Sequence, residues 1–421
     1  MCTSLACGLP DEILAEIFRY CMQGFEHPLK LGDFPEQFQI LDILLLVTSA
    51  CSRWRNVASC TAKLWTSLFI DATRPAEPQS SIIKTFLERS ANASLDMYIS
   101  GPSDPAVEAQ TGFLQLYELI SDHIWRCSAF CFRRIQDEMI SRIFPLPLMP
   151  RLQTVIISSQ TFRTSTIPFF VDPASYLHIK EAVIIRIPVD PFPANSIDKL
   201  QLGWGHVPRP WVLPLIASTS QITSLELVNA DGLSPVIPAT PISLPNLTHM
   251  WQRGRGADLF LDTPVLKELH WKRLDPRSPD YRYSFPSVSK LHLERPRANI
   301  VRRIPQLRFH FPSLETLVIE DIDDMGAMIR AMLLPRPPTD PADTDPHPAP
   351  ETLALPCPRL ESLVLKKVNM NIYDRREQGL KDLLEIYPHV IVQYDGAEAV
   401  ANRDNFWDRL QSLFPGRLVM L

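Results

Sequence analysis

The sequence predicts a mixed α/β protein with two parts, a small helical module near the N-terminus and a long array of repeated short strands after it. Three observations support this fold class: apolar residues at helical spacing early in the chain, a Pro-x-Leu pattern that recurs later, and 40 prolines against 14 glycines. A chain of 421 residues also exceeds what one hydrophobic core usually organises. Many prolines with few glycines indicate repeated stops between short elements.

The first predicted helix lies in the stretch LPDEILAEIFRYCM, residues 9–22. Pro10 suits the first helical position, and the side chains of Asp11 and Glu12 suit the positive end of the helix dipole. The apolar residues of this helix are Ile13, Leu14, Ile17, Phe18 and Cys21. They cover more than one simple stripe, so we expect one side to pack inside its own domain and the other to be covered by something else.

Two further helices are expected in the same module. The second carries Leu41, Leu44, Leu45 and Val47, and the third runs through Trp54 and Val57 towards Leu64 and Trp65. Three short helices within about seventy residues form only a marginal core by themselves. We therefore predict a helical domain at residues 5–70 and a second domain at residues 75–421.

Two helix–strand pairs are expected to open the second domain. Residues 81–90 and 112–124 have helical spacing, whereas residues 93–100 and 125–132 alternate like strands. A helix followed by a strand, twice over, is already a repeat of supersecondary units.

From residue 150 onward the repeat is visible in the amino-acid letters. The pattern P-x-[LV]-x-x-[LVM]-x-[LIW] starts at Pro150, Pro245, Pro264, Pro286, Pro312 and Pro358, with weaker copies at Ser196 and Gln221. Most neighbouring copies are about 18 to 27 residues apart, which is the signature and period of the leucine-rich repeat. In such a repeat the last two apolar positions point into the core from a short strand. We therefore predict neighbouring parallel strands that carry Leu269, Leu291 and Leu317.

The repeats are irregular, and a long insertion interrupts them. In place of the usual asparagine or cysteine after the strand stand the apolar residues Leu274, Ile322 and Val368. Residues 335–350 contain seven prolines among sixteen residues, so we predict a disordered insertion there. Residues 388–396 are expected to form a last strand and residues 405–414 a capping helix.

The N-terminal stretch resembles the F-box motif. The resemblance rests on Leu9-Pro10, Ile13-Leu14, Ile17-Phe18, Val47, Cys51, Arg53-Trp54 and a closing Leu64-Trp65. It covers residues 9–69, with a longer linker between the first two helices than usual. The remainder is similar to the degenerate leucine-rich repeats that follow the F-box in many fungal, especially mushroom-type, proteins.

This resemblance implies a function in protein ubiquitination. In such proteins the F-box binds a Skp-type adaptor, which links it to a cullin–RING ubiquitin ligase, and the repeats hold a protein substrate. The chain would then be a non-enzymatic substrate-recognition subunit located in the cytoplasm or nucleus. The adaptor-binding residues implied in this way are Leu9, Pro10, Ile13, Leu14, Ile17, Val47, Trp54, Leu64 and Trp65. For Trp54 and Trp65, packing inside the domain is an equal alternative.

A substrate-binding surface is predicted on the exposed face of the strands. Aligned copies of the repeat place on that face Trp251, His270, Lys272, Lys290, His292, Glu294 and Glu320. An aromatic side chain beside polar neighbours is typical of interface hot spots, so we select Trp251, His270, Lys272, His292 and Glu294 as substrate-binding. The alternative is a plain polar surface on which Trp251 folds over an edge.

Other functional classes find little support. The net charge of −5 lacks the basic excess of a nucleic-acid binder, and neither a signal peptide nor a membrane span is recognisable. No catalytic or phosphate-binding motif is found. The spacing of His123, Cys127 and Cys131 would place metal ligands on one helix face, but residues 125–132 alternate like a strand and no fourth ligand is evident. We therefore expect buried thiols, no metal and no cofactor.

Two alternatives stay open. A run of arginines that begins at Arg295 is expected to be a solvated edge, but it could also hold an acidic or phosphorylated substrate. The alternative function is a non-enzymatic repeat scaffold that uses the F-box adaptor outside protein degradation.

Overall fold

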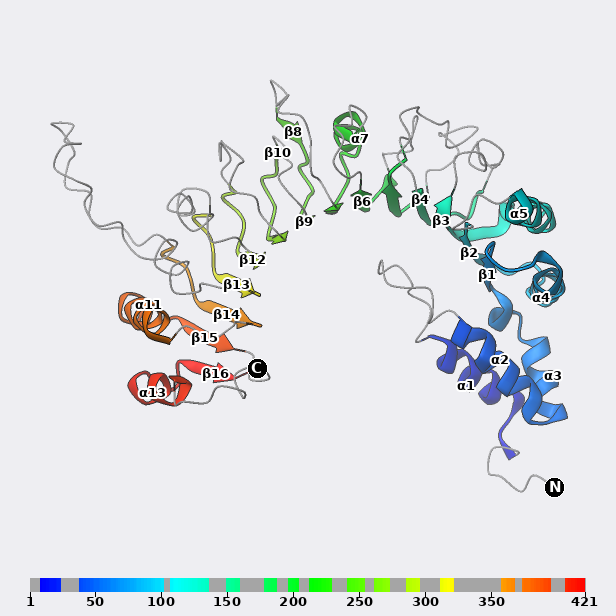
Figure 1. Ribbon diagram of the computed structural model, residues 1–421, viewed down its shortest axis with the longest axis horizontal. Coiled ribbons are helices and arrows are strands. Elements are labelled where there is room, and N and C mark those ends of the chain that lie inside the picture. Colours follow the sequence, from blue (N-terminus) through cyan, green and yellow to red (C-terminus); the bar gives the residue numbers. More distant parts are fainter. Residues whose placement is uncertain are drawn as a thin grey trace. The chain divides into compact units, whose positions relative to one another are not determined.

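A computed structural model describes residues 8–23, 38–101, 107–135, 149–159, 178–187, 196–203, 212–228, 241–253, 261–272, 285–295, 311–321, 357–367, 373–394 and 406–420. The chain forms two compact units, Met1–Ser196 and Ile197–Leu421, and each combines helices with parallel strands (Figure 1). The predicted insertion at 335–350 lies outside the described residues, as do Leu274, Ile322 and Val368. The predicted domain limits of 5–70 and 75–421 stay predictions.

The first unit begins with the helical module, and its three predicted helices are present. They are α1 (Asp11–Gln23), α2 (Phe38–Ala50) and α3 (Ser52–Cys60), followed by the 3-10 helix η3 (Ala62–Trp65). α1 packs against α2, α3 and η3, and buries Leu14, Phe18 and Met22, a helical spacing of four residues. α1 starts one residue later than expected, since the Pro10 carbonyl accepts the first helical hydrogen bond from the Leu14 N–H (3.1 Å).

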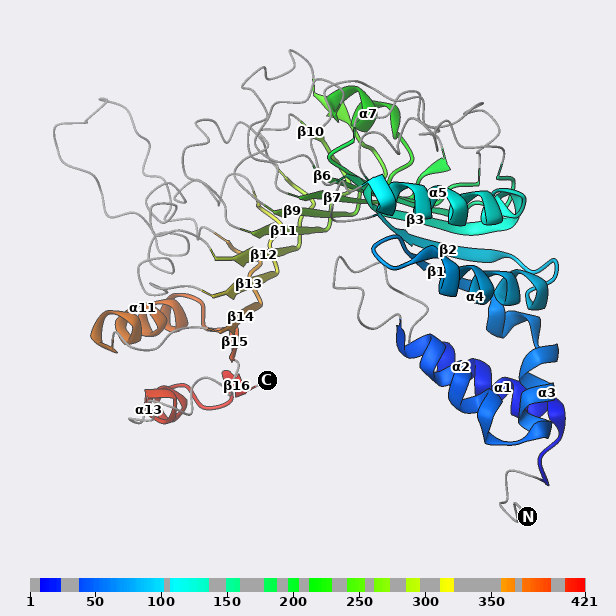
Figure 2. The same cartoon turned by 45° about the vertical axis from the view of Figure 1, so that its right-hand side comes forward.

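A parallel sheet follows the helical module within the first unit. Its strands, paired in chain order, are β1 (Ser67–Asp71), β2 (Leu95–Ser100), β3 (Cys127–Ile135), β4 (Thr154–Ser159) and β5 (Glu181–Ile185). The first three strands are connected by α4 (Ala76–Arg89) and α5 (Val107–Ser121), which pack against each other on the same side of the sheet (Figure 2). The sheet starts earlier than residue 75, because β1 follows η3 almost directly.

β1 was not predicted, and two further strands of the first unit differ from the sequence prediction. The strand expected at residues 125–132 begins only at Cys127, because Ile124–Arg126 forms a 3-10 turn. β5 was not predicted, because its segment lacks the proline and has Ala182 where the repeat pattern has Leu, Val or Met. Its consecutive buried residues Ala182, Val183 and Ile184 are typical of a parallel strand covered on both faces.

Arg126 connects α4 to the sheet. It is 1% exposed, and its guanidinium donates hydrogen bonds to the Leu87 carbonyl (3.2 Å), the Ser90 hydroxyl (3.0 Å) and the Ala91 carbonyl. These acceptors lie at the C-terminal end of α4, where backbone carbonyls have no partner inside the helix and where a positive charge is favourable. Arg126 therefore satisfies the end of α4 directly before β3 begins.

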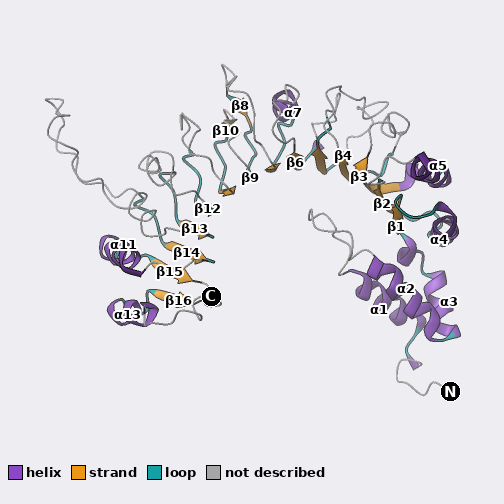
Figure 3. Cartoon of the chain, viewed as in Figure 1, coloured by secondary structure: helices purple, strands orange, loops and turns teal. Residues whose placement is uncertain are grey.

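The second unit contains one long parallel sheet and one small one. The strands of the long sheet, in spatial order, are β6 (Lys199–Gly203), β7 (Ser224–Val228), β9 (His249–Arg253), β11 (Glu268–Lys272), β12 (Lys290–Glu294), β13 (Thr316–Glu320), β14 (Ser362–Lys366), β15 (Ile391–Tyr394) and β16 (Leu418–Met420). β8 (Ile242–Ser243) and β10 (Leu261–Asp262) form the small one. The connections contain α7 (Val212–Ser218), α11 (Tyr373–Ile386) and α13 (Phe406–Leu413), of which the last two lie on one side of β15 and β16 (Figure 3).

The repeat pattern corresponds to strands in this structure. Every copy quoted above contains one, from β4 after Pro150 to β14 after Pro358. Leu269 of β11 is the register partner of Leu291 in β12, which in turn pairs with Leu317 in β13, and all three are buried. Since alternate residues of a strand point to opposite faces, each strand buries the same two positions on one side of the sheet.

The prolines of the repeat are turn residues. At Pro245, Pro312 and Pro358, the carbonyl of the preceding residue accepts a hydrogen bond from the N–H two residues after the proline, at 3.2, 3.2 and 3.1 Å. Proline thus occupies the second position of a β-turn, where its fixed φ is favourable and its missing N–H is not needed. The turn directs the chain into each strand at the same point of the repeat.

The strand predicted at residues 388–396 is present as β15, but it is not the last strand. After α13 the chain forms β16, which pairs with β15. A Pro-Gly turn precedes it, in which the Arg417 N–H donates to the Phe414 carbonyl (3.2 Å) and Gly416 has a φ of 76°. A positive φ at the third turn position requires glycine or a similarly permissive residue, so Pro415-Gly416 was the available sequence signal for this strand.

We predict that Arg126→Met destabilises the first unit by about 2–4 kcal/mol, because several carbonyls at the end of α4 lose a buried donor. Chemical denaturation followed by far-UV circular dichroism measures the effect. The matched control is Arg151→Met, an exposed arginine that donates to the Asn92 carbonyl (3.0 Å) and should change stability by less than about 0.5 kcal/mol. Equal losses in the two variants would contradict the assigned role of Arg126.

Candidate functional site

An apolar stripe on α1 points away from the core of the helical module. Its members Ile13, Ile17 and Tyr20 are 46%, 42% and 78% exposed. Spacings of four and three residues place them along one side of the helix. α2 adds the exposed side chains of Leu45 and Leu46. We call these five side chains the apolar helix face.

The nine predicted adaptor-binding residues do not all lie on the surface. Pro10, Ile13 and Ile17 are exposed, Leu9, Val47 and Trp54 are half-buried, and Leu14, Leu64 and Trp65 are buried. The three buried residues belong to the core of the chain itself. Their contribution in this structure is packing, and a direct contact with an adaptor stays a prediction for all nine.

Three members of the apolar helix face were not predicted to bind an adaptor, namely Tyr20, Leu45 and Leu46. α2 reads FQILDILLLVTSA, which is more apolar than a helix with one buried side requires. That excess was the sequence signal for Leu45 and Leu46. Spacing alone could not show which side of α2 faces solvent.

Arg53 and Trp54 attach α3 to α1. The Arg53 guanidinium donates two hydrogen bonds to the Asp11 carboxylate (2.9 and 2.7 Å) and one to the Leu9 carbonyl. The Trp54 ring lies 5.2 Å from the Phe18 ring, centroid to centroid. The Arg-Trp dipeptide therefore orients the first turns of α1, from which Ile13 and Ile17 project.

Trp65 joins the helical module to α4. Its indole N–H donates to the Ala58 carbonyl (2.8 Å), and its ring packs edge-to-face on Phe86 at 5.1 Å. The Arg89 guanidinium lies 4.3 Å from the centre of the Trp65 ring. Trp65 therefore packs inside the first unit, and its contact with an adaptor stays a prediction.

A second surface lies on β7 to β14 of the second unit. The residues between the buried positions of these strands point to the other side of the sheet. The register pairs Glu226 with Trp251, Trp251 with His270, and His270 with His292. The next row along the same side contains Arg253, Lys272, Glu294 and Glu320. We call these two rows the polar strand face.

The polar strand face brings together the five residues selected as substrate-binding. Trp251 is half-buried, and its ring stacks on His249 with centroids 5.8 Å apart. β9 is paired on both sides, with β7 and with β11, so Trp251 stands within the sheet and not on an edge strand. Whether a substrate binds there stays a prediction.

His270 and His292 form a stacked pair on this face. Their ring centroids are 3.9 Å apart, and each ring faces a carboxylate of the following strand: His270 Nε2 lies 3.5 Å from Glu294, and His292 Nε2 lies 3.1 Å from Glu320. The pKa of His270 is lowered to about 4, chiefly by burial and then by His292 and Arg253, against the opposing effect of Glu294 and Glu320. Burial also lowers the pKa of His292, against Glu320. Both imidazoles are therefore neutral at pH 7.

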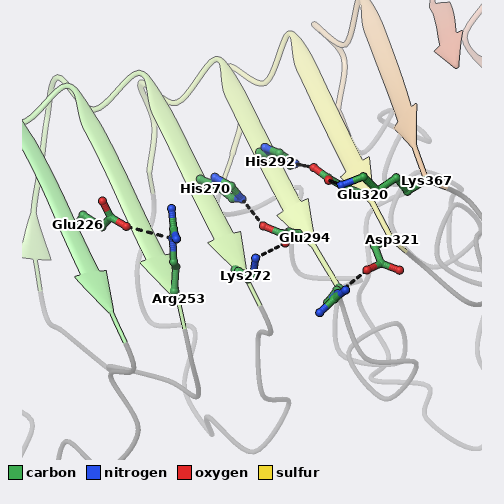
Figure 4. Close-up of polar contacts among 10 residues, drawn as sticks. Glu226, Arg253, His270, Lys272, His292, Glu294, Glu320, Asp321 and Lys367 are labelled. Carbon is green, nitrogen blue, oxygen red and sulfur yellow. Dashed lines mark hydrogen bonds and ion pairs between the residues drawn. The ribbon is translucent and has the colours of Figure 1, made fainter. Parts of the chain in front are cut away.

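Ion pairs cross the polar strand face from strand to strand (Figure 4). Arg253 Nε lies 3.0 Å from Glu226, Lys272 pairs with Glu294, and Lys367 Nζ lies 2.8 Å from Glu320. Burial raises the pKa of Glu226, against the effect of Arg253. Each pair joins residues far apart in the sequence, so these contacts arise only when the strands stack.

Metal-binding and thiol chemistry find no support in the described part of the chain. His123, Cys127 and Cys131 form no metal-ligand group, and no other such group of three occurs among these residues. Burial raises the pKa of Cys131 to about 11, so its thiol is protonated at neutral pH. No helix within the described ranges is long and apolar enough to cross a membrane.

The comparisons with known proteins concern the helical module. Residues 6–71 match the F-box-like family. The F-box-like domain thus spans α1, α2, α3, η3 and β1, and it contains the whole apolar helix face. No curated protein shows a detectable similarity to the chain.

We predict that the stacked histidines make the fold acid-sensitive. In an unfolded chain histidine binds a proton near pH 6.5, whereas His270 in the folded chain does so only at about pH 4. Between these values the unfolded state binds more protons, so the free energy of unfolding falls as the pH falls. Between pH 7 and pH 4.5 the free energy of unfolding should therefore fall less in His270→Gln than in the parent chain, by on the order of 2 kcal/mol.

Urea denaturation at the two pH values measures this difference. His389→Gln is the matched control, because it makes the same substitution at an exposed histidine of the same unit. An unchanged acid sensitivity in His270→Gln would contradict the prediction.

Proposed function

We propose that this chain is the substrate-recognition subunit of a Skp–cullin–F-box ubiquitin ligase. The observation that carries the proposal is the F-box-like domain at residues 6–71 with its exposed apolar helix face. An F-box domain implies binding to a Skp-type adaptor in a cullin ligase complex. Exposed side chains such as Ile13, Ile17 and Tyr20 are those that a stable partner would cover.

The strands that follow the F-box-like domain are, in this proposal, irregular leucine-rich repeats of the type found in fungal F-box proteins. Support comes from the recurring proline turn and from the two buried positions in each parallel strand. The polar strand face would bind the protein substrate, with Trp251 as an aromatic anchor among polar neighbours.

The ubiquitin transfer would belong to the assembled ligase. F-box proteins are typically non-enzymatic adaptors, and we propose the same for this chain, in the cytoplasm or nucleus. The alternative is a repeat scaffold that uses the adaptor outside degradation. Purification of the chain with its adaptor distinguishes the two, since a ligase subunit also brings down a cullin and a scaffold does not.

Adaptor binding is tested by Ile13→Asp combined with Ile17→Asp. Both side chains are exposed in the free chain, so folding should change by less than about 1 kcal/mol. In a complex the new carboxylates would be buried without a partner, and the Kd for a purified Skp-type adaptor should rise at least about 100-fold.

The matched control for adaptor binding is Ile82→Asp, the same change at an isoleucine that is 39% exposed on α4. It should bind the adaptor like the parent chain. Undiminished binding by the Ile13/Ile17 variant would refute the assignment of the apolar helix face.

Substrate binding is tested by Trp251→Ala, and by His270→Ala with His292→Ala. Affinity purification with proteasome inhibition, followed by quantitative mass spectrometry, should show reduced substrate capture while adaptor binding stays unchanged. The matched control is Trp125→Ala, an exposed tryptophan of the first unit. If the variants capture the parent's substrates and changes in residues 395–421 lose them, the polar strand face is not the binding site.

A further inference from the structure

The ion pairs of the polar strand face share one asymmetry: the cation is always more exposed than its carboxylate. The exposed fractions of the side chains are 47% for Arg253 against 23% for Glu226, 28% for Lys272 against 16% for Glu294, and 59% for Lys367 against 15% for Glu320. The carboxylate is thus the less accessible member of each pair. A molecule that approaches this face from solvent therefore meets positive charge first.

The exposed cations lie along the side of the sheet where the strands have their carboxyl-terminal ends. Arg253 and Lys272 end β9 and β11, while Arg295 and Lys367 directly follow β12 and β14. Parallel strands place their carboxyl ends along the same edge, and Figure 4 shows Arg253, Lys272 and Lys367 near the ends of the strands. We call these four side chains the basic edge. Asp321, which follows β13, pairs with Arg295.

Two members of the basic edge are direct neighbours. Arg253 and Lys272 are register partners on adjacent strands, an arrangement of like charges that destabilises a sheet. Arg253 pairs with Glu226 through its Nε atom, and Lys272 pairs with Glu294. Each of these two carboxylates therefore pairs with one of the two neighbouring cations. The terminal nitrogens of Arg253 and the remaining ammonium hydrogens of Lys272 retain donor capacity for a further acceptor. A local rule broken in this way often marks a functional surface.

We propose that the basic edge docks an extended acidic protein segment, rich in Asp and Glu, beside Trp251. This inference rests on the proposed function, because the segment would belong to the substrate. The distance from β9 to β14 is four strand spacings, roughly 19 Å, which about six extended residues span. Trp251 lies two residues before Arg253 on the same side of β9, where it offers an aromatic surface next to the charges.

Fluorescence anisotropy with the full chain tests the proposal. The probes are a labelled Asp/Glu-rich peptide, an Asn/Gln-rich peptide of equal length and a phosphoserine-containing version of the latter. We expect the acidic peptide to bind at least about tenfold tighter than the neutral one, with an affinity that falls as salt is added. Arg253→Gln with Lys272→Gln should weaken its binding about fivefold to tenfold.

The matched control removes two exposed cations elsewhere, by Lys84→Gln with Arg359→Gln. It changes the net charge equally and should leave peptide binding intact. Equal weakening in both double variants, no preference for the acidic over the neutral peptide, or binding of the phosphoserine peptide alone would each overturn the proposal.

Adaptor binding by the same preparation separates this inference from the proposed function. Peptide binding without adaptor binding would refute the proposed function and leave the basic edge as an acidic-segment site. Adaptor binding without acidic-peptide binding would refute only the inference about the basic edge.

Discussion

The parallel register of the strands is the constraint on which each unit depends. Every strand must bury its alternate side chains on the same side, and neighbouring strands must place equivalent residues next to each other, as Leu269, Leu291 and Leu317 do. A parallel strand cannot follow its neighbour through a tight hairpin, so each connection has to return the chain to the same edge of the sheet. The proline turns before β9, β13 and β14 meet this requirement, because they start each strand at a set point.

The connecting helices impose a second requirement, because the carbonyl groups at their C-terminal ends need hydrogen-bond donors. In the first unit the guanidinium of Arg126 supplies such donors for α4. In the second unit Arg417 has the same role for α11, since it donates to the carbonyls of Leu384 (2.7 Å) and Tyr387 (2.5 Å). In each case one arginine supplies several donors in a fixed geometry and links the end of a helix to the strand that directly follows the arginine, which is β3 after Arg126 and β16 after Arg417.

The two candidate surfaces differ in physical character, which fits different kinds of partner. The apolar helix face offers isoleucines, leucines and a tyrosine on short helices with a small core, so a covering partner would gain hydrophobic burial and also stabilise the module. The polar strand face has little apolar surface beyond Trp251. Its carboxylates are less exposed than their paired cations and its histidines are neutral, so specificity there would come from charge and hydrogen bonding.

The sequence by itself determined the kinds of elements and their order, because helical spacing around Leu14 and Phe18 and the recurring Pro-x-Leu pattern are local signals. It missed β1 and β5, the short strands β8 and β10, the helices α7 and α11, and β16, whose Pro415-Gly416 signal stood outside the pattern. Only the tertiary structure decided which apolar residues are exposed: Leu14 is buried and Ile13 beside it is not, because the direction of the core depends on α2 and α3. The alternation of side chains along a strand was enough to predict that Trp251 and His270 lie on the same face of the sheet. The stacking of His270 on His292, and the exposed cation in each pair, depend on side chains from strands that are distant in the sequence. Local periodicity cannot encode such contacts, because they form only once the register brings those strands together.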